Sequence, residues 1–368
     1  MSERADAQAH ARFAALDDLR GAAILLVVLY HGVTQAWGFQ PPQGGDYWLA
    51  FIYAGNSGVT LFFLLSGILV SRPFFLARQR RQPLDLKRYA VQRALRILPL
   101  YYLMVVVGVL VTGHYEQLPA ALAFLAWGHS LGTFSNVWWS LATEVQFYVV
   151  LPLMFLMLTY SRWLVVAALL AWLVVFTAVC LHAVSFGLLG TLYWVLSLGG
   201  KLPAFLLGMG IGWALVERRL PSVAPRSGQI GLMLLVIMLA AFLQVTIEHG
   251  VVEFSLRQPW VVLPESLLWG AVAWLMLATP GLGGGAATRP LRYLGRISYS
   301  LYLIHLPVIM YCLSFAETRG EPVALGVSLG LGLSLVLAHL SYSVIEKPFL
   351  SLKSRYSSNT QLSEASPV

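Results

Sequence analysis

An arginine and a histidine lie in the first apolar segment of the chain, at positions that lipid would otherwise surround. Arg20 and His31 are eleven residues apart, a step that in an α-helix returns to within about 20° of the same face and rises about 16 Å. Because the hydrocarbon core of a bilayer is about 30 Å thick, Arg20 is expected near one boundary and His31 near the middle. Ionisable side chains at that depth usually mark proton paths or substrate sites. The shared face favours a functional histidine, and a packing histidine bonded to a neighbouring helix is the alternative.

A carboxylate is expected at a comparable depth on another helix. Glu144 lies six residues after Trp138 in a predicted helix that runs inward from the outer face, which places it about 9 Å below that interface. Beside His31, this carboxylate could orient the imidazole and stabilise its protonated form, as general-base catalysis requires. The alternative is a structural hydrogen bond between Glu144 and a neighbouring helix. No group of charged residues suggests a metal site.

Basic residues gather between the predicted second and third helices. Loop 71–92 and the start of the third helix hold Arg72, Arg78, Arg80, Arg81, Lys87, Arg88, Arg93 and Arg96. Orientation in the membrane and attraction to anionic headgroups account for most of the charge in 72–88. Arg93 and Arg96 differ, because their i,i+3 spacing places both guanidiniums on one face of a helix start, where forked donors suit phosphate oxygens. Arg88 is the third candidate for this role.

The composition indicates what kind of scaffold must hold these residues. With 58% hydrophobic and only 11% charged residues, the chain could not present a soluble surface, so we predict an all-α polytopic membrane protein. Ten apolar segments are long enough to span a bilayer, which puts both termini on one side. They are 17–36, 49–70, 92–112, 138–157, 163–183, 199–217, 229–247, 261–279, 297–316 and 324–345. The sixth is the least regular, because Gly199, Gly200 and Pro203 interrupt it.

The lysines and arginines are sorted by side of the membrane. The formal net charge of +8 could suggest a nucleic-acid partner, but all of the 24 basic residues except Lys201, Arg257 and Arg319 fall on the side of the termini. Positively charged loops stay in the cytoplasm, so we predict cytoplasmic termini and no nucleic-acid partner. Cys180 and Cys312 lie in apolar segments without a paired spacing, which argues against a disulfide framework or a zinc site.

We predict three parts along the chain. Residues 1–15 form a polar cytoplasmic tail, 16–350 the transmembrane domain and 351–368 a disordered tail. Asp17 and Asp18 are placed where the first helix starts, and capping of its free N–H groups is their simplest role. Asp17 also lies three residues before Arg20, close enough to hold its guanidinium. The first apolar run lacks a small-residue cleavage pattern, so we interpret it as a membrane helix.

Small residues repeat at four-residue steps in two of the predicted helices. The pairs are Gly208 with Gly212 and Gly326 with Gly330. Such steps place both glycines on one face, where another helix can approach closely inside a bundle. We therefore predict helix contacts at both pairs.

Six short motifs occur in order along almost the whole chain. They are Arg20-x10-His31, Gly58–Gly67, Arg93–Pro99, Trp139–Glu144 with Gln146–Tyr148, Gly295–His305 and Ile345–Pro348. Together they resemble acyltransferase family 3, a family of membrane O-acyltransferases. The sequence departs from the usual family pattern at Asp18, where the family has glycine.

This resemblance implies a reaction. It implies an acyl-coenzyme A donor, commonly acetyl-coenzyme A, used from the cytoplasmic side, and a hydroxyl acceptor on a carbohydrate or another lipid-linked or secreted molecule. The donor phosphates are then expected at Arg93 and Arg96 and the thioester near Arg20. His31 would act as general base or as acyl carrier, with Glu144 holding its ring. The implied location is a bacterial-type inner membrane, without the hydrolase-like extracytoplasmic domain of some relatives. The resemblance implies neither which molecule carries the acceptor hydroxyl nor the oligomeric state of the protein.

Other residues of the same motifs are secondary candidates. They are Trp139, Ser140, Tyr148, Ser298, Tyr299 and His305. Trp139 and Ser140 are expected to pack and cap, while His305 either has a structural role or lines the acyl path. Glu346 and Lys347 are expected to form an ion pair at the inner end of the last helix.

Two other classes of function stay open. A proton-coupled transporter or exporter would use His31 and Glu144 as a proton relay. Many such transporters are built from internal repeats, and this chain shows no repeat between its halves. A non-catalytic partner in a membrane assembly would not need His31 at all.

Overall fold

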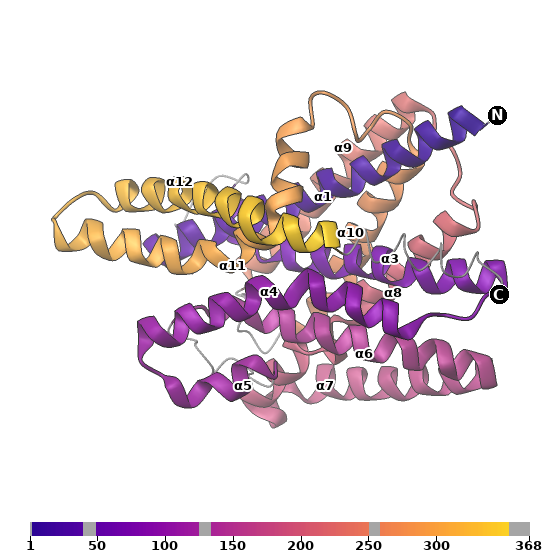
Figure 1. Ribbon diagram of the computed structural model, residues 1–368, viewed down its shortest axis with the longest axis horizontal. Helices are drawn as coiled ribbons and strands as arrows, with labels where there is room; N and C mark the ends of the chain where they lie inside the picture. The colour runs from indigo at the N-terminus through magenta and orange to yellow at the C-terminus, as the bar shows by residue number, and fades with distance from the viewer. Residues whose placement is uncertain (1, 40–48, 125–133, 250–257, 353–368) are drawn as a thin grey trace. The chain divides into compact units, whose positions relative to one another are not determined.

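The structure is a computed structural model that describes residues 2–39, 49–124, 134–249 and 258–352. Within these ranges the chain forms helices and no strand, which confirms the predicted all-α class (Figure 1). The α-helices are α1 (Ser2–Trp37), α2 (Leu49–Tyr53), α3 (Ser57–Arg80), α4 (Leu86–Thr112), α5 (Leu118–Leu122), α6 (Trp139–Tyr160), α7 (Arg162–Leu196), α8 (Leu198–Val216), α9 (Pro225–Glu248), α10 (Gln258–Ala278), α11 (Arg289–Thr318) and α12 (Val323–Ser341). Short helical turns are η1 (Tyr115–Gln117), η2 (Asn136–Trp138) and η3 (Tyr342–Glu346).

In the described part of the chain, nine helices are long and apolar enough to cross a membrane. They correspond to the last nine of the ten predicted segments. The first predicted segment, 17–36, lies in α1, which is not one of the nine. The chain is therefore a multi-pass membrane protein, as its composition predicts.

The chain divides into two compact units. Unit 1 comprises Met1–Gln82 and Thr143–Ser298, and unit 2 comprises Pro83–Ala142 and Tyr299–Val368. The borders fall inside α6 and α11, so these two helices contribute residues to both units. Of the predicted site residues, Arg20, His31 and Glu144 belong to unit 1, whereas the arginines of α4 belong to unit 2.

Glycines set the helix packing of unit 1. A Cβ placed on Gly208 of α8 would lie 2.0 Å from the carbonyl oxygen of Leu64 on α3. A Cβ on Gly58 of α3 would lie 2.4 Å from the carbonyl oxygen of Ala23 on α1. The backbones approach this closely only because glycine has no side chain. The predicted contact at Gly208 is confirmed, and α3 packs against α1, α8 and α10.

Gly208→Ala is expected to destabilise the protein by roughly 1–3 kcal/mol, because the new methyl group must push apart the backbones of α3 and α8. Gly210→Ala is the matched control in the same helix. Nothing lies within 4 Å of its Cβ position, so the substitution should be neutral or stabilise by up to about 1 kcal/mol. Thermal unfolding of the purified protein measures both, and equal effects would contradict glycine-mediated packing at Gly208.

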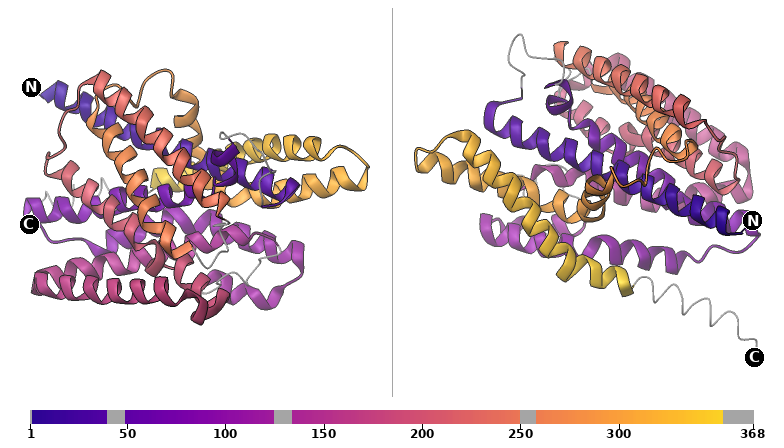
Figure 2. Two further views of the ribbon diagram at one scale, coloured as in Figure 1. Left: turned by 180° about the vertical axis from the view of Figure 1, so that it is seen from behind. Right: turned by 90° about the horizontal axis from the view of Figure 1, so that it is seen from above.

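In unit 2, α11 and α12 run antiparallel and side by side (orange and yellow in Figure 2). A Cβ on Gly330 would lie 2.9 Å from the Cα atom of Ile309, and one on Gly326 would lie 3.1 Å from the carbonyl oxygen of Cys312. This confirms the second predicted glycine contact. The chain then continues from α12 into η3, a π-helical turn that ends at Glu346 and packs against α4. Single π-turns in proteins are frequent at functional sites.

Helices extend beyond the apolar segments that predicted them. The predicted tail 1–15 is helical, because α1 begins at Ser2. The predicted loop 71–92 shrinks to a few residues, since α3 runs to Arg80 and α4 begins at Leu86. Asp85 caps α4 by accepting a hydrogen bond from the backbone N–H of Arg88 at 2.8 Å. Backbone hydrogen bonds continue a helix into water as well as in lipid, so hydrophobicity alone places its ends poorly.

Three other segments also differ from the prediction. The segment 49–70 is interrupted between α2 and α3, whereas α8 is continuous through the glycines and the proline that were expected to interrupt it. The α7 helix continues past residue 183 to Leu196, with a kink at His182 and Gly187. Most of the predicted disordered tail, 353–368, lies outside the described residues.

Candidate functional site

His31 is buried near the end of α1, with 6% of its surface exposed. Its Nδ1 lies 2.9 Å from the carbonyl oxygen of Val27, one turn earlier in the helix. A carbonyl oxygen only accepts hydrogen bonds, so Nδ1 carries the proton and Nε2 carries the lone pair of the neutral ring. This bond holds the ring in the tautomer that a general base or a nucleophile at Nε2 requires.

Arg20 is held on α1 by an acidic neighbour. Its Nη1 donates to Oδ1 of Asp17 at 2.8 Å, which confirms the predicted contact. The two side chains keep 29% and 33% of their surface exposed. Exposed ion pairs contribute little to stability, so the pair matters mainly by orienting the guanidinium.

Asp18 does not cap α1, because the helix begins far upstream. Its side chain is almost fully buried and accepts hydrogen bonds from the backbone N–H of Gly284 at 2.6 Å and from Thr288 Oγ1 at 2.7 Å. Arg292 Nε also donates to this carboxylate, at 3.1 Å. These bonds tie α1 to the start of α11, where a Cβ on Gly295 would lie 2.0 Å from the carbonyl oxygen of Asp17. Asp18 therefore anchors the turn of α1 that carries Arg20.

Glu144 accepts two hydrogen bonds on one carboxylate oxygen. Ser66 Oγ of α3 and the hydroxyl of Tyr148 each donate to Oε1 at 2.6 Å. Two hydroxyl donors from different directions fix the orientation of the carboxylate. The structure thus brings together Glu144 and Tyr148, and it adds Ser66, which lies within the Gly58–Gly67 motif. The pairing of Glu144 with His31 stays a prediction.

A buried charged cluster was not predicted from the sequence. Lys201 of α8 and Glu265 of α10 are each only 5% exposed, and the charge of Lys201 acts on the Glu265 carboxylate. The side chains of Ser57 and Thr60 at the start of α3 hydrogen-bond to Glu265. Lys201, expected at the outer end of a helix, is buried instead, and its neighbour there is Glu265. Its signal in the sequence is that it is the sole carboxylate in the predicted segment 261–279.

The buried cluster lies close to the His31 turn of α1. Trp269 Nε1 donates to Ser57 Oγ at 2.6 Å, which ties α10 to the first residue of α3. The next residue, Gly58, meets α1 at Val27, where its Cβ position lies 3.0 Å from Cγ2. Val27 is the residue whose carbonyl holds the His31 ring. The first turn of α3 therefore connects the charged cluster with the backbone that positions His31.

Unit 2 contains a second buried carboxylate. Glu346, 4% exposed, forms an ion pair with Arg96 and accepts a hydrogen bond from Ser300 Oγ at 2.8 Å. The Arg96 guanidinium also lies over the ring of Tyr299, 5.6 Å from its centre, and the Tyr299 hydroxyl donates to the carbonyl of Ile97 at 2.7 Å. The prediction that Glu346 pairs with Lys347 is wrong. From the π-helical turn, this carboxylate reaches Arg96 of α4 instead.

Arg96→Ala is expected to destabilise the protein by about 3 kcal/mol, because it leaves the Glu346 carboxylate buried without its cation. Adding Glu346→Gln should recover most of that loss. Lys347→Met, one residue along the chain, should stay within about 0.5 kcal/mol of wild type. Chemical unfolding in detergent measures all three. A larger loss of stability in Lys347→Met than in Arg96→Ala would show that Glu346 pairs with Lys347 and not with Arg96.

Of the other predicted site residues, Ser140 and His305 have contacts that the structure shows, and the rest keep only a predicted role. Ser140 Oγ lies 2.7 Å from the hydroxyl of Tyr302, which donates to the carbonyl of Val137 at 2.6 Å, so Ser140 ties the start of α6 to α11. His305 is fully buried, and its Nδ1 lies 3.0 Å from the carbonyl of Leu301. Roles in the reaction stay predictions for Arg88, Arg93, Trp139, Tyr148, Ser298 and Tyr299.

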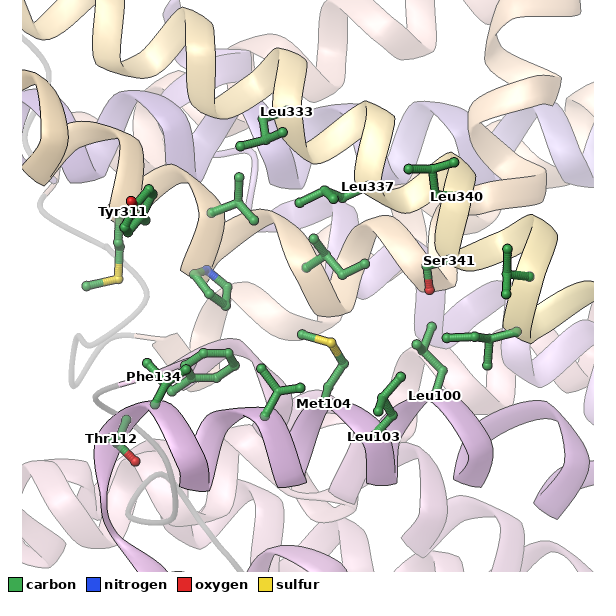
Figure 3. Close-up of a pocket in the computed structure, with 18 residues that line it drawn as sticks. Leu100, Leu103, Met104, Thr112, Phe134, Tyr311, Leu333, Leu337, Leu340 and Ser341 are labelled. Carbon is green, nitrogen blue, oxygen red and sulfur yellow. The ribbon is translucent and has the colours of Figure 1, made fainter.

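An apolar cavity of about 710 Å³ lies between α4, α11 and α12 of unit 2 (Figure 3). Leu103 and Met104 of α4 lie across it from Leu337 of α12. Only Thr112, Tyr311 and Ser341 contribute hydroxyl groups to its lining. Such a lining suits an alkyl chain better than a sugar or a nucleotide. In the described ranges, no group of three or more histidine, cysteine or acidic residues is placed to hold a metal ion.

Comparison with known proteins places this geometry in a family. The family model described as "Acyltransferase domain" matches residues 13–342. YrhL of Bacillus subtilis is 29% identical over 93% of this chain and 55% of its own length. The peptidoglycan O-acetyltransferase OatA of Listeria monocytogenes is 28% identical over 90% of this chain and 55% of its own length. BcsY of Komagataeibacter xylinus is 28% identical over 92% of this chain and 83% of its own length.

The chain thus spans about half the length of the first two of these relatives. No solved structure matches it. The family model covers almost all of the helical bundle, from the part of α1 that carries Arg20 and His31 to the end of α12, and it stops at the first residue of η3. This multi-pass membrane protein belongs to the acyltransferase family that the matched domain defines.

Proposed function

We propose that the chain transfers an acyl group, commonly acetyl, from acyl-coenzyme A to a hydroxyl group of a cell-envelope carbohydrate. The observation that supports this most directly is the His31 ring, which is buried in α1 with its Nδ1 proton held by the Val27 carbonyl. A relative named as a peptidoglycan O-acetyltransferase supports acetyl as the group and an envelope glycan as the acceptor. We also propose that α1 spans the membrane as a tenth helix, so that both termini lie in the cytoplasm, as the distribution of basic residues indicates.

Two reaction sequences use the same lone pair of His31. As a general base, Nε2 takes the proton of the acceptor hydroxyl while its oxygen attacks the thioester carbonyl, and the carbon–sulfur bond breaks to release the thiolate. As an acyl carrier, Nε2 itself attacks the thioester and releases the thiolate. The acceptor oxygen then attacks the acyl-imidazole, the carbon–nitrogen bond breaks, and the hydroxyl proton leaves to the thiolate or to water. In both, the Val27 carbonyl stabilises the positive charge that develops on the ring.

Incubation with unlabelled acetyl-coenzyme A and labelled coenzyme A, without acceptor, separates these sequences. The acyl-carrier route is reversible before the acceptor enters, so label should appear in acetyl-coenzyme A at a rate comparable to turnover. The general-base route should give no exchange above that of the His31→Ala protein. Chromatography of the nucleotide pool measures the exchange.

The proposed function itself is tested on the cell envelope. A strain that lacks the gene should lose an acetyl mass increment from a glycan or glycolipid, and the wild-type gene should restore it. Proteoliposomes provide the contrast with a transporter, because a proton-coupled transporter would move solute without an acyl donor. Solute movement driven by pH, together with an unchanged envelope, would contradict acyl transfer.

The arginines of α4 are one of two candidate sites for the donor phosphates. Arg96 is engaged by Glu346 and Tyr299, so its guanidinium is already oriented before any ligand binds. Such preorganisation favours bidentate recognition of an anion but also gives Arg96 a structural role. Arg93→Ala is the preferred test of donor binding, because Arg96→Ala also removes the ion pair of the buried Glu346 carboxylate.

A further inference from the structure

Unit 1 contains a pocket of about 530 Å³ where the N-terminal part of α1 meets the C-terminal ends of α3 and α8. Four arginines line it, namely Arg12, Arg72, Arg80 and Arg218. Its other lining residues are mostly apolar, among them Leu16 and Ile68, and none of the described lining residues is acidic. A concave apolar floor with several converging cations is the composition of a binding site for a large anion.

Contacts between helices fix the walls of this pocket. The Arg72 guanidinium lies 5.0 Å from the centre of the Phe13 ring, which joins α3 to α1. Gln79 Nε2 donates to the carbonyl of Val216 at 3.2 Å, which joins α3 to α8. The segment after α8 is held by a hydrogen bond from the backbone N–H of Val223 to the carbonyl of Ala278 at 2.9 Å. The pocket is therefore part of the packed bundle.

Among the side chains that the structure describes, no carboxylate compensates the positive charge of the pocket. Within the described ranges, none of its four guanidiniums forms an ion pair with a carboxylate, whereas Arg20, Arg96 and Arg292 each do. Arg72 and Arg80 also repel each other. Because like charges in one concave site are unfavourable, a bound anion would stabilise the arrangement.

The backbone conformation of Arg218 is unusual, and a role in orienting the chain in the membrane would not require it. It lies two residues after the end of α8 at Val216, with φ of 55° in the left-handed region, and the backbone N–H of Arg219 donates to the carbonyl of Ala214 at 2.8 Å. Glycine usually occupies this position because a side chain is disfavoured there. Arg81, directly after the end of α3, is also left-handed, with φ of 56°, but does not line the pocket. The chain thus offers a matched pair of arginines that differ in access to the pocket.

We propose that the arginine pocket, in place of Arg93 and Arg96 of α4, binds the phosphate groups of the coenzyme A donor, a statement that rests on the proposed function. Forked guanidinium donors suit phosphate oxygens, and the apolar floor suits the uncharged parts of the nucleotide. Arg12, Leu16 and Arg20 follow at steps of four residues, so they form a stripe along one side of α1. The stripe leads from the pocket to Arg20, and His31 lies about 16 Å further along the helix. The acyl end of a donor bound in the pocket would point along this stripe towards His31.

Binding of coenzyme A and of adenosine 3′,5′-bisphosphate to the purified full chain tests the proposal. Calorimetry is carried out in nanodiscs of phosphatidylcholine, which carry no anionic lipid. Arg218→Gly and Arg72→Gln should each raise the Kd of both probes by about tenfold, which is the loss of affinity expected for one charge-assisted phosphate contact. The matched controls Arg81→Gly and Arg78→Gln remove the same charge from the same end of the helices, and their Kd should stay within about twofold of wild type.

Folding of the variants is checked separately. Arg218→Gly and Arg81→Gly each remove a side chain from the left-handed region, so neither should lower the thermal midpoint. Loss of affinity in Arg218→Gly without loss of stability therefore reports on the pocket. The proposal is overturned if the pocket variants change the Kd no more than their controls do.

Anionic lipid headgroups are the other source of phosphate, and a separate experiment tests them. Nanodiscs with added phosphatidylglycerol should not change the pattern of variants. If the pocket variants lose retained phosphatidylglycerol but keep the Kd for coenzyme A, the pocket is a lipid site and the proposal fails. Acyl transfer by the wild-type protein is measured in parallel. If the wild-type protein transfers acyl groups but the pocket variants bind coenzyme A with the wild-type Kd, only the pocket proposal is wrong. If the pocket variants bind coenzyme A more weakly but the wild-type protein transfers no acyl group, only the proposed function is wrong.

Discussion

His31→Ala is expected to abolish acyl transfer while the protein stays inserted and keeps nearly the wild-type affinity for its donor. The ring serves the bond-making step through Nε2, so its loss should lower the turnover number by about 10²–10⁴-fold if it is a general base. The loss should be larger if the ring carries the acyl group, because the covalent intermediate then cannot form without Nε2 of His31. Transfer of labelled acetyl groups in donor-saturated membranes measures the effect.

His249→Ala is the matched control for His31→Ala. The Nδ1 of His249 lies 2.9 Å from the carbonyl of Val245, so it has the same local bond as His31, but at an exposed position. Removing it should leave acyl transfer unchanged. If His31→Ala retains wild-type transfer under donor saturation, His31 is a packed core residue and the catalytic assignment fails.

Lys201→Met is expected to destabilise the protein by about 3–5 kcal/mol, the largest stability effect among the substitutions proposed here. Lys201 and Glu265 are both 5% exposed, so removing the cation leaves a carboxylate in the bundle interior with only the side chains of Ser57 and Thr60 as partners. A buried charge without its counterion must be neutralised or rehydrated, and either change costs free energy. Denaturant unfolding of the purified protein measures the difference.

The double variant Lys201→Met with Glu265→Gln separates a charge effect from a packing effect. Because it removes both charges, it should recover most of the stability lost in Lys201→Met, and the amide can still bond to the two hydroxyls. Additive losses would show that the two side chains do not interact and that the cluster is only a set of packed residues. The coupling energy of this cycle is therefore the decisive quantity.

These two results concern neighbouring parts of unit 1. The Ser57 hydroxyl accepts from Trp269, and the adjacent Gly58 packs on the α1 turn whose carbonyl holds the His31 ring. Loss of the charged cluster is therefore expected to disturb the position of His31 as well as the stability of the bundle. A partial loss of transfer in Lys201→Met that the double variant recovers would show this connection.

The fold class was predictable because it depends on local properties of the chain. An apolar stretch of about 20 residues in a bilayer must satisfy its own backbone hydrogen bonds, so it forms a helix whatever surrounds it. The glycine pairs were predictable for a similar reason, since four-residue steps place them on one face. The ends of α3 and α4 were not, because arginines outside the apolar stretch still continue the helix.

Partners of the charged residues depend on distant parts of the chain. Only the local pair Asp17–Arg20 was predicted correctly, since its three-residue spacing is a property of one helix. Asp18 bonds to Arg292, and Glu346 pairs with Arg96 across most of the chain. No spacing rule encodes such pairs, because they depend on which helix faces meet in the bundle.

By itself, the sequence determined a polytopic helical membrane protein with an arginine and a histidine on one face of its first helix. Hydrophobicity and helical periodicity act over a few turns, and both can be read from consecutive residues. Only the tertiary structure decided that Val27 holds the His31 ring, that Ser66 and Tyr148 hold Glu144, and that four arginines from α1, α3 and the segment after α8 share one pocket. Burial in a bundle forces each polar group to find a partner, and the packing of the helices decides which partner is within reach.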